Sequence, residues 1–210
     1  MTSPRFIVLE GIDGSGTTTQ AARLVAALRE RGMNAVATCE PTPGPVGKLI
    51  RGALKRELTT DGGSPHALPW TSMALLFAAD RLDHVESMIA PALGAGTTVV
   101  CDRYVLSSLA YQSSTSPDGE AALPWIRSLN ARALQPELTL VLDVPEDVAR
   151  ARRESRGGRP ELFEVQELQR RLAQIYLRAG ELLPGEHVVH IADGPVPDVG
   201  ARILEVVLGR

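Results

Sequence analysis

The sequence predicts one α/β domain in which a parallel five-stranded sheet is flanked by helices on both faces. Five short apolar runs rich in Val, Ile and Leu recur along the chain without alternating with polar residues, as strands covered on both faces do. Helix-forming stretches separate these runs, which favours a doubly wound arrangement. The 210 residues suffice for one domain with a sizeable core, and no linker divides them. We therefore expect a single domain over residues 1–210.

The expected elements alternate in regular order. The strands are expected at 6–9, 35–38, 97–101, 138–144 and 188–192. The helices are expected at 18–31, 46–58, 69–94, 105–114, 120–134, 146–155, 161–182 and 197–208. Pro69 is typical of a helix start, and Pro91 should end or kink the long helix that it lies in. Segments 59–68 and 113–119 are rich in Gly, Ser, Thr, Asp and Pro and are expected to be loops.

Composition excludes several classes of function. Hydrophobic residues make up 44% of the chain, but no run reaches the roughly 18 apolar residues of a membrane span, so no membrane partner is expected. The start, Met1-Thr-Ser-Pro4, lacks the pattern of an export signal, which favours a cytoplasmic location. A net charge of −3 argues against nucleic acid as a partner. Cys39 and Cys101 are interpreted as unpaired packing residues.

A glycine-rich segment directly follows the first expected strand. In Glu10-Gly-Ile-Asp-Gly-Ser-Gly-Thr-Thr-Thr-Gln20, three residues match the phosphate-binding P-loop pattern of Gly, four residues, Gly, Lys and Ser or Thr. Its backbone N–H groups and the following helix N-terminus would hold phosphate. The residues expected to bind ATP phosphates are Gly11, Ile12, Asp13, Gly14, Ser15, Gly16, Thr17, Thr18 and Thr19. The fold is then of the P-loop NTPase type; the alternative is a glycine-rich turn without a ligand.

The lysine of the P-loop pattern is missing. Thr17 occupies its position, whereas Gly11, Gly16 and Thr18 are in register. The Thr18 hydroxyl is placed to bind Mg²⁺. Phosphoryl transfer depends on stabilising negative charge, so loss of this cation could cost a few kcal/mol unless another cation replaces it. The motif predicts nucleotide binding and raises doubt about catalysis.

Polar residues follow three of the expected strands. Glu10 and the P-loop follow the first strand, Glu40-Pro-Thr-Pro-Gly44 the second, and Asp102-Arg103-Tyr104 the third. Ligands of parallel α/β sheets bind outside the carboxyl ends of the strands. Packing alone does not account for three such clusters at one edge, so this edge is the expected site.

Four sequence blocks resemble the thymidylate kinase family, whose members transfer the γ-phosphoryl group of ATP to dTMP. The blocks are Glu10-Gly-Ile-Asp-Gly-Ser-Gly16, Glu40-Pro41 leading to Gly47-Lys-Leu-Ile-Arg51, Leu76-Phe-Ala-Ala-Asp-Arg81, and Asp102-Arg-Tyr-Val-Leu-Ser-Ser-Leu-Ala-Tyr-Gln112. A weaker block runs from Leu140-Val-Leu-Asp-Val144 into an arginine-rich stretch. The resemblance implies ATP and dTMP as substrates, Mg²⁺ as cofactor, and a homodimer.

The resemblance also implies a dTMP site. Phe77 resembles the aromatic residue that stacks on thymine, and Arg81, on the same helix face, the donor to a thymine carbonyl. Ser108 corresponds to a residue near the base and Tyr111 to the residue beneath the sugar, where a phenol disfavours a 2′-hydroxyl. Gln112 is assigned to the same site. The alternatives are a core role for Phe77, a surface position for Arg81, and plain solvent exposure for Gln112.

The acceptor phosphate would lie between the P-loop and the third strand. Arg103 resembles the family arginine that holds this phosphate, and Asp13 the carboxylate near the acceptor and metal. Asp102 is a candidate Mg²⁺ ligand. The alternatives are a purely structural pair with Arg103 for Asp102 and a role in the tight turn alone for Asp13. Glu40 and Pro41 are assigned to the dTMP site. Cys39 stands where the family usually has arginine, and Thr42-Pro43-Gly44 replaces Gly-Gly-Thr, which puts the detail of acceptor binding in doubt.

An arginine-rich segment at about 150–161 resembles the family's mobile lid. Arg153 and Arg156 are the cations expected to serve catalysis in place of the missing lysine, among the further candidates Arg150, Arg152 and Arg159. Glu164 resembles an acid near the metal. The alternative is an exposed helix whose arginines form i,i+4 ion pairs.

Three functions are compatible with these features. The first is an active thymidylate kinase, the second a nucleotide-binding protein without kinase activity, and the third a kinase for another deoxynucleotide or nucleoside. All the sequence blocks that resemble substrate-binding segments of the family are present, which favours an active thymidylate kinase. The apolar helices at 69–94 and 105–114 are the expected homodimer interface.

Overall fold

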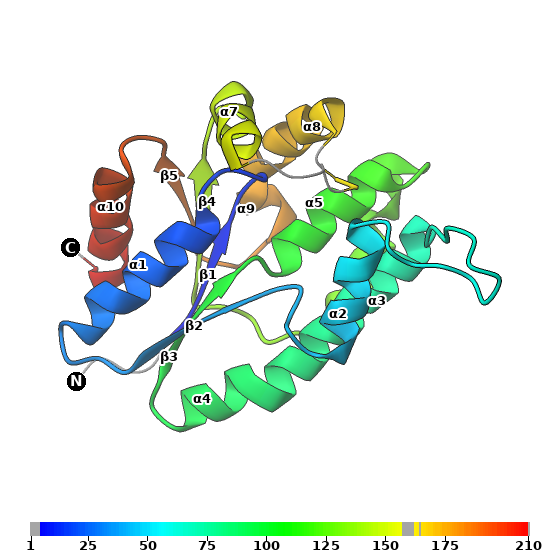
Figure 1. Ribbon diagram of the computed structural model, residues 1–210. Coiled ribbons are helices and arrows are strands. Elements are labelled where there is room, and N and C mark those ends of the chain that lie inside the picture. Colours follow the sequence, from blue (N-terminus) through cyan, green and yellow to red (C-terminus); the bar gives the residue numbers. More distant parts are fainter. Residues whose placement is uncertain (1–4, 157–161, 164, 210) are drawn as a thin grey trace.

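The computed structural model describes residues 5–156, 162–163 and 165–209 (Figure 1). Its centre is a five-stranded sheet in the order β2-β3-β1-β4-β5 in which every pair of neighbours is parallel. The strands are β1 (Phe6–Glu10), β2 (Ala35–Cys39), β3 (Thr98–Asp102), β4 (Leu138–Asp143) and β5 (Val188–Ala192). The predicted fold class is confirmed, and each expected strand matches an observed one within a residue.

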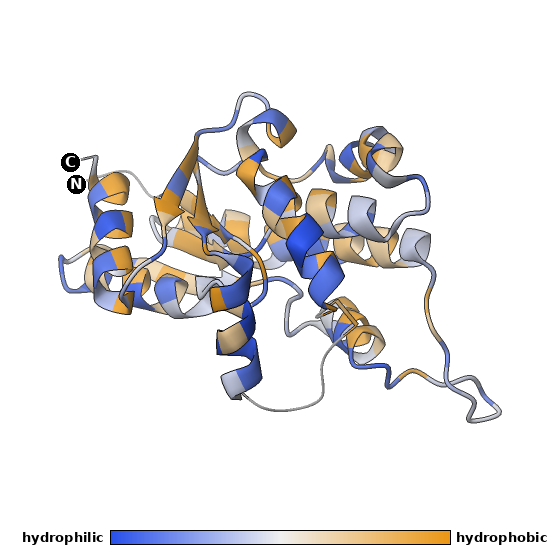
Figure 2. Cartoon of the chain, turned by 90° about the horizontal axis from the view of Figure 1, so that it is seen from above, coloured by the Kyte–Doolittle hydropathy of each residue, from blue (hydrophilic) through white to orange (hydrophobic). Residues whose placement is uncertain are grey.

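Helices cover both faces of the sheet. The helices α1 (Thr17–Arg29) and α10 (Val196–Leu208) lie side by side on one face (Figure 1). The other face carries α3 (Trp70–His84), α5 (Val105–Thr115) and α8 (Gln166–Leu177). Apolar residues concentrate on the central strands, whereas the outer helices present mixed faces (Figure 2). The central β1 is buried along its whole length, as expected for a strand sandwiched between two helix layers.

The long helix predicted over 69–94 continues past Pro91. It consists of α3, a π-helical turn η1 (Val85–Ile89) and α4 (Ala90–Gly94). In the π-helical turn, the Ala90 N–H donates to the Val85 carbonyl five residues earlier. Proline cannot donate and clashes with the carbonyl four residues before it, so a wider turn just ahead of Pro91 accommodates its ring. Of the two outcomes expected for Pro91, an end to the helix is not observed, and a local distortion of the helix just ahead of the proline is.

Several predicted helix boundaries were too wide. The helix expected at 46–58 is α2 (Pro45–Leu54), and that at 120–134 is a 3₁₀ turn η2 (Gly119–Ala122) followed by α6 (Leu123–Asn130). The helix expected at 161–182 begins only at Gln166 and is split into α8 and α9 (Ala179–Leu182). The remaining helix, α7 (Glu146–Arg156), agrees with its prediction. Segment 59–68 is a loop as expected, an exposed arm closed by a bridge between Thr59 and Pro65, whereas the loop expected at 113–119 begins only after Thr115.

No helix in the described part of the chain is both long enough and apolar enough to cross a bilayer.

Candidate active site

The carboxyl ends of β1, β2 and β3 open onto one cavity of about 140 Å³. All the residues expected to bind dTMP line this cavity, together with Asp13. Its lining consists of Asp13, Glu40, Pro41, Leu54, Phe77, Arg81, Arg103, Tyr104, Ser107, Ser108, Tyr111, Gln112 and Phe163. Strand order explains the assembly, because β2, β3 and β1 are neighbours and their polar ends therefore meet at one sheet edge.

Four lining residues were not expected from the sequence. Tyr104 and Ser107 lie within the Asp102–Gln112 block, whose pattern could have indicated them. Leu54 and Phe163 carry no chemical signal and come together only through tertiary contact. The Phe163 ring lies 5.3 Å from that of Tyr111, and the backbone N–H of its neighbour Leu162 donates to the Leu54 carbonyl. These two residues add apolar surface to the cavity wall.

Arg81 is buried beneath the cavity, with 1% of its surface exposed. Its Nη2 lies 2.7 Å from a carboxylate oxygen of Glu40 and donates to the Tyr104 carbonyl at 2.8 Å. Its Nη1 donates to Ser108 Oγ at 3.0 Å and to the side chain of Asn130. The interpretation as a plain surface arginine is therefore wrong. Because Nε has no partner among the described residues, one N–H of this guanidinium is unused in the protein.

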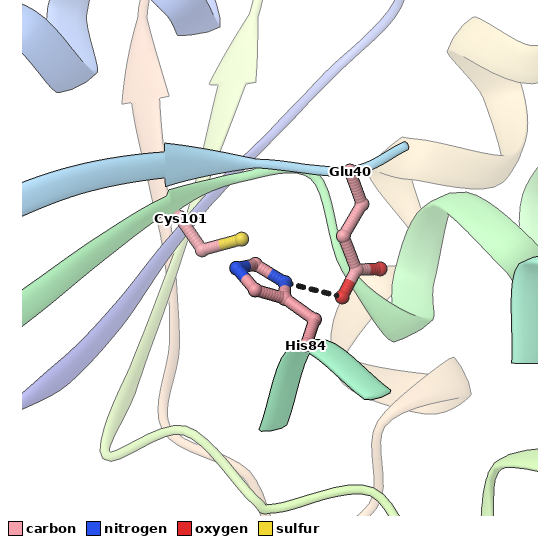
Figure 3. A group of neighbouring side chains, drawn as sticks. All are labelled: Glu40, His84 and Cys101. Carbon is pink, nitrogen blue, oxygen red and sulfur yellow. Dashed lines mark hydrogen bonds and ion pairs between the residues drawn. The ribbon is translucent and has the colours of Figure 1, made fainter. Parts of the chain in front are cut away.

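Glu40 also connects to His84 (Figure 3). The His84 Nδ1 lies 3.1 Å from Glu40 Oε1, and its Nε2 lies 2.7 Å from the Thr38 hydroxyl. Cys101 completes a buried group whose ligand atoms lie within 4.8 Å of one another. Burial raises the pKa of the Cys101 thiol well above its usual value, which disfavours the thiolate that a metal would require. With Glu40 already paired to Arg81, His84 is best described as a hydrogen-bonded support for Glu40, whereas the Cys101 thiol donates to the Arg103 carbonyl at 3.1 Å.

Two further lining residues have polar atoms in a buried setting. Gln112 is 1% exposed, so the interpretation as solvent-facing decoration is wrong, and its Oε1 has no partner in the described part of the chain. Burial raises the pKa of the Tyr111 phenol, which therefore stays neutral at physiological pH. Phe77 is partly buried and packs against the core while lining the cavity, so it combines the core role with access to a ligand.

The P-loop joins β1 to α1 and approaches α7 closely. Gly16 is the N-cap of α1 in a left-handed conformation and supplies no side-chain cap, which leaves the N-terminal N–H groups of α1 for another acceptor. Gly14 has a φ of 90°, and a Cβ there would lie 2.3 Å from the Ala149 carbonyl oxygen. Glycine is thus required by both conformation and space. Thr17, at the lysine position, is buried.

Arg103 reaches from the end of β3 to the P-loop. Its Nη2 donates to Asp13 Oδ1 at 2.6 Å, and its Nη1 donates to the Gly11 carbonyl at 3.0 Å. The guanidinium carbon lies 5.4 Å from the centre of the Tyr111 ring. Its backbone adopts a left-handed φ of 68°, which is unfavourable for a residue with a side chain and concentrates at functional sites. Gln169 of α8 fixes Asp13 from the other side, accepting from its N–H at 3.1 Å and donating to Oδ2 at 2.8 Å.

Thr18 and Asp102 form the oxygen-rich corner expected to hold a metal. The Thr18 hydroxyl donates to Asp102 Oδ2, and Asp102 Oδ1 is buried with no partner among the described residues. A hydroxyl and a carboxylate with an unused oxygen suit Mg²⁺, which prefers such ligands. Asp102 makes no ion pair with Arg103 among the described contacts, since Arg103 is paired with Asp13. The third expected ligand, Glu164, lies outside the described residues.

The arginines of α7 take different partners. Arg153 donates to the Asp13 carbonyl of the P-loop and to Glu146 at 3.0 Å. Arg152 pairs with Asp193 at 2.9 Å, whereas Arg150 forms the i,i+4 surface pair with Glu154. The helix therefore combines the exposed-pair alternative with one cation held against the P-loop. The side chain of Arg156 and all of Arg159 lie outside the described part of the structure.

A second cavity, of about 130 Å³, lies beside the end of the P-loop and the start of α1. It is lined by Ser15, Gly16, Thr19, Gln20, Leu142, Val144, Arg152, Ile191, Ala192, Asp193, Gly194, Val196 and Val199. The sequence showed no donor-base pocket, because these residues come from four separate stretches of the chain. Residues of the P-loop thus line both cavities, Asp13 the first and Ser15 and Gly16 the second.

The altered loop 42–44 is held firmly despite its unusual sequence. Asp80 accepts from the Thr42 N–H at 2.7 Å and from its hydroxyl at 2.6 Å. Arg51 donates to the carbonyls of Pro41 and Thr42. Burial raises the pKa of the Cys39 thiol, so this residue adds no charge where the family usually has arginine. The substitutions change the charge of the loop but leave it well supported.

Comparison with known families and proteins agrees with this geometry. The Thymidylate kinase family matches residues 9–203. The chain is 41% identical over 202 residues to a probable thymidylate kinase of Pyrococcus horikoshii, covering 96% of this chain and 95% of the relative. It is 38% identical over 202 residues to the thymidylate kinase of Bordetella petrii, covering 95% and 92% of the two chains. The chain belongs to the thymidylate kinase family.

Proposed function

We propose that the protein is a thymidylate kinase that transfers the γ-phosphoryl group of ATP to dTMP. The observation that carries this proposal is the single cavity in which Phe77, Arg81 and Arg103 meet at the mouth of the P-loop. The cavity combines an aromatic surface for a base, buried donors for its polar edge, and an arginine for the acceptor phosphate. Names of the family and of the relatives support the same reaction.

The acceptor would enter the cavity with its base deepest. Phe77 would stack on thymine, worth about 1–3 kcal/mol. The unused Nε–H of Arg81 and the unpartnered Oε1 of Gln112 supply a donor and an acceptor, matching the carbonyl and N–H of a thymine edge. Ser108 holds Arg81 in place, and Tyr111 would face the sugar and favour deoxyribose.

The donor would lie with its phosphates along the P-loop, from Gly11 to Thr19. The N-terminal N–H groups of α1 would bind the phosphate oxygens. The second cavity, beside Gly16 and Arg152, would hold the donor base. The transferring group would then lie between the P-loop and Arg103.

Transfer needs alignment and charge neutralisation more than a general base, because the acceptor phosphate is already anionic near neutral pH. Arg103 would hold the acceptor phosphate, and its pairing with Asp13 fixes its direction. Arg153, held against the Asp13 carbonyl, is the described cation nearest in function to the missing lysine, with Arg156 as a second candidate. Thr18 and Asp102 would hold Mg²⁺, together with Glu164; the ion would neutralise phosphate charge.

Three further assignments belong to this proposal. Residues 1–210 would act as one domain, and segment 150–161, of which 157–161 lie outside the described residues, would be the lid over ATP. The two unpaired cysteines support a cytoplasmic location, where thiols stay reduced. A homodimer would use the exposed apolar side chains Leu49, Leu75 and Trp125 of α2, α3 and α6. The helix expected at 105–114 is mostly buried within the subunit, so α5 is removed from the proposed interface.

The test is ADP formation from ATP and Mg²⁺ in the presence of dTMP, dUMP, dCMP or dGMP, with an acceptor-free control. Turnover with dTMP far above the others is expected. Binding of dTMP without turnover would instead identify a catalytically inactive relative, and preference for another acceptor would identify a different kinase. The dimer is tested separately by sedimentation, where a monomer at micromolar concentration would contradict it.

A further inference from the structure

Glu10 is a fully buried carboxylate at the end of β1, directly before the P-loop. Its Oε1 accepts from the backbone N–H groups of Tyr104 at 2.8 Å and Ser107 at 3.1 Å. Its Oε2 accepts from the Ser107 hydroxyl at 2.6 Å and from the Tyr176 hydroxyl at 3.4 Å. Four donors from two other segments thus converge on one side chain.

Two of these donors, the N–H groups of Tyr104 and Ser107, belong to the first turn of α5, where they have no partner within the helix. Tyr104 is the N-cap of this helix and supplies no side-chain cap. The first N–H groups of a helix lack intrahelical partners and carry partial positive charge, so a carboxylate there is favourable. Glu10 therefore caps α5 from the end of β1, although β3 is the strand that directly precedes this helix. Glu10 and Tyr104 are 94 positions apart in sequence. A cap of this kind fixes where the helix begins.

The residue immediately before that cap is Arg103, in its left-handed conformation. The Arg103 N–H donates to the Leu9 carbonyl at 2.9 Å, one residue before Glu10. Its guanidinium donates to the Gly11 carbonyl, one residue after Glu10. Residues 9 to 11 thus hold the backbone and the side chain of Arg103 together with the helix that follows it. A left-handed backbone persists only where the surroundings determine it.

The Glu10 network extends to α8 through Tyr176. The Tyr176 hydroxyl lies 2.9 Å from Ser107 Oγ, and Arg103 Nη1 donates to both hydroxyls at 3.3 Å. Carboxylate, two hydroxyls and guanidinium therefore form one closed set of hydrogen bonds. Buried polar networks of this kind are stabilising only when their members are satisfied, so loss of the carboxylate should disturb all of them.

We propose that Glu10 is a positioning residue for phosphoryl transfer, which holds the strained Arg103 turn in register with the P-loop by capping α5 and anchoring Ser107 and Tyr176. This inference rests on the proposed kinase function. Glu10 does not touch substrate in this role. It acts through Arg103, and so ties the acceptor-binding arginine to the phosphate-binding loop.

If Glu10 only filled space in the core, a neutral side chain of the same size would serve equally well at this position. Burying a carboxylate is costly, and its desolvation raises the pKa of Glu10 above the usual value of 4.5. A glutamine is nearly the same size but turns an NH₂ group toward donors, which cannot accept from them. The Glu10→Gln variant thus keeps the volume and removes the charge and half of the acceptors.

The experiment compares Glu10→Gln with Glu186→Gln in the full-length protein. Glu186 controls for the loss of a buried carboxylate in general, because it is a partly buried acid whose pKa burial also raises, and its side chain accepts from the Thr139 hydroxyl rather than from the donors at the start of α5. We expect kcat/KM for dTMP to fall at least about tenfold in Glu10→Gln, with KM for ATP within about twofold of wild type. Glu186→Gln should retain both constants.

Two variants keep the test decisive if Glu10→Gln fails to fold. Ser107→Ala and Tyr176→Phe remove donors to Glu10 and leave the acid in place, and each should lower kcat/KM for dTMP by a smaller factor in the same direction. Unchanged kinetics in a folded Glu10→Gln, or in both of these variants, would overturn the proposal. An equal rise in KM for ATP and dTMP would also overturn it, because general loosening of the fold would then explain the loss. Absence of wild-type turnover refutes the kinase assignment itself, and is seen before any variant is made.

Discussion

The two proposed sides of this site, one for the phosphoryl acceptor and one for the donor, are built on different principles. On the acceptor side the two arginines are already paired inside the protein, Arg81 with Glu40 and Arg103 with Asp13. On the donor side the usual lysine is replaced by the buried Thr17, and backbone N–H groups and α7 remain near the phosphate path. An arginine already paired with a carboxylate needs little rearrangement when substrate binds. A loop that binds phosphate through backbone N–H groups alone needs a cation from another segment to neutralise the phosphate charge.

The comparison implies that catalysis depends on how the two sides are joined. Asp13 is the shared residue, since its carboxylate pairs with Arg103 and its carbonyl accepts from Arg153. A cation on each side of the transferring group is what a charge-dispersed transition state requires. Substitutions that change one side at a time therefore test how much each side contributes.

The largest effect is expected for Arg103→Ala. Removing the acceptor-side cation should lower kcat by about 10²–10³-fold or more, because charge stabilisation in the transition state is lost. The measurement is dTMP-dependent ADP formation, with circular dichroism to confirm folding. Wild-type turnover in this variant would remove Arg103 from the mechanism.

A somewhat smaller loss, about 10²-fold in kcat, is expected for Arg153→Ala on the donor side. Arg170→Ala is the matched control, because Arg170 lies 3.9 Å from the same carboxylate, Glu146, but is largely exposed. The control should retain wild-type kcat. Equal rates in both variants would show that the cation on the donor side comes from another residue.

Thr17→Lys tests whether the donor side has been rebuilt around the missing lysine. We expect a change in kcat of less than about tenfold in either direction, because Arg153 already brings positive charge to the loop and like charges repel. Steady-state kinetics at saturating ATP and dTMP provide the measurement. A gain of a hundredfold would instead mean that the natural loop is impaired.

The smallest effect is a pH dependence of stability that arises from Glu10. Burial raises its folded-state pKa, so its favourable contribution is present below pH 4.5 and is lost as pH rises through the folded pKa. The ionisable groups that interact with it are Arg103, Tyr176, Cys101 and Glu186. Urea unfolding should show the wild type losing free energy relative to Glu10→Gln as pH rises. A constant difference between pH 4.5 and 7.5 would contradict this assignment.

Much of the fold could be predicted because its signals are local. An apolar run such as Phe6–Leu9 is typical of a strand covered on both faces, and the Gly11–Thr18 spacing between a strand and a helix indicates a phosphate-binding loop. The residues proposed to bind the acceptor could be gathered from the sequence for a similar reason, since each follows a strand or lies on a predicted helix face, and the structure brings them to one cavity. Helix ends were less predictable: α8 begins at Gln166, later than its composition suggested.

Only the tertiary structure decided which charges pair and which residues close the site. Arg103 meets Asp13 across 90 positions, and Arg153 meets the Asp13 carbonyl across 140. These partners depend on the strand order β2-β3-β1-β4-β5, which places β1 between the strands that lead to Arg103 and Arg153. Whether two charged residues pair, and which residues line a cavity, depends on how close the residues lie in the folded chain, and separation in sequence does not give that distance. The sequence by itself determined the chemical groups available for phosphoryl transfer, and the fold decided which of them act together.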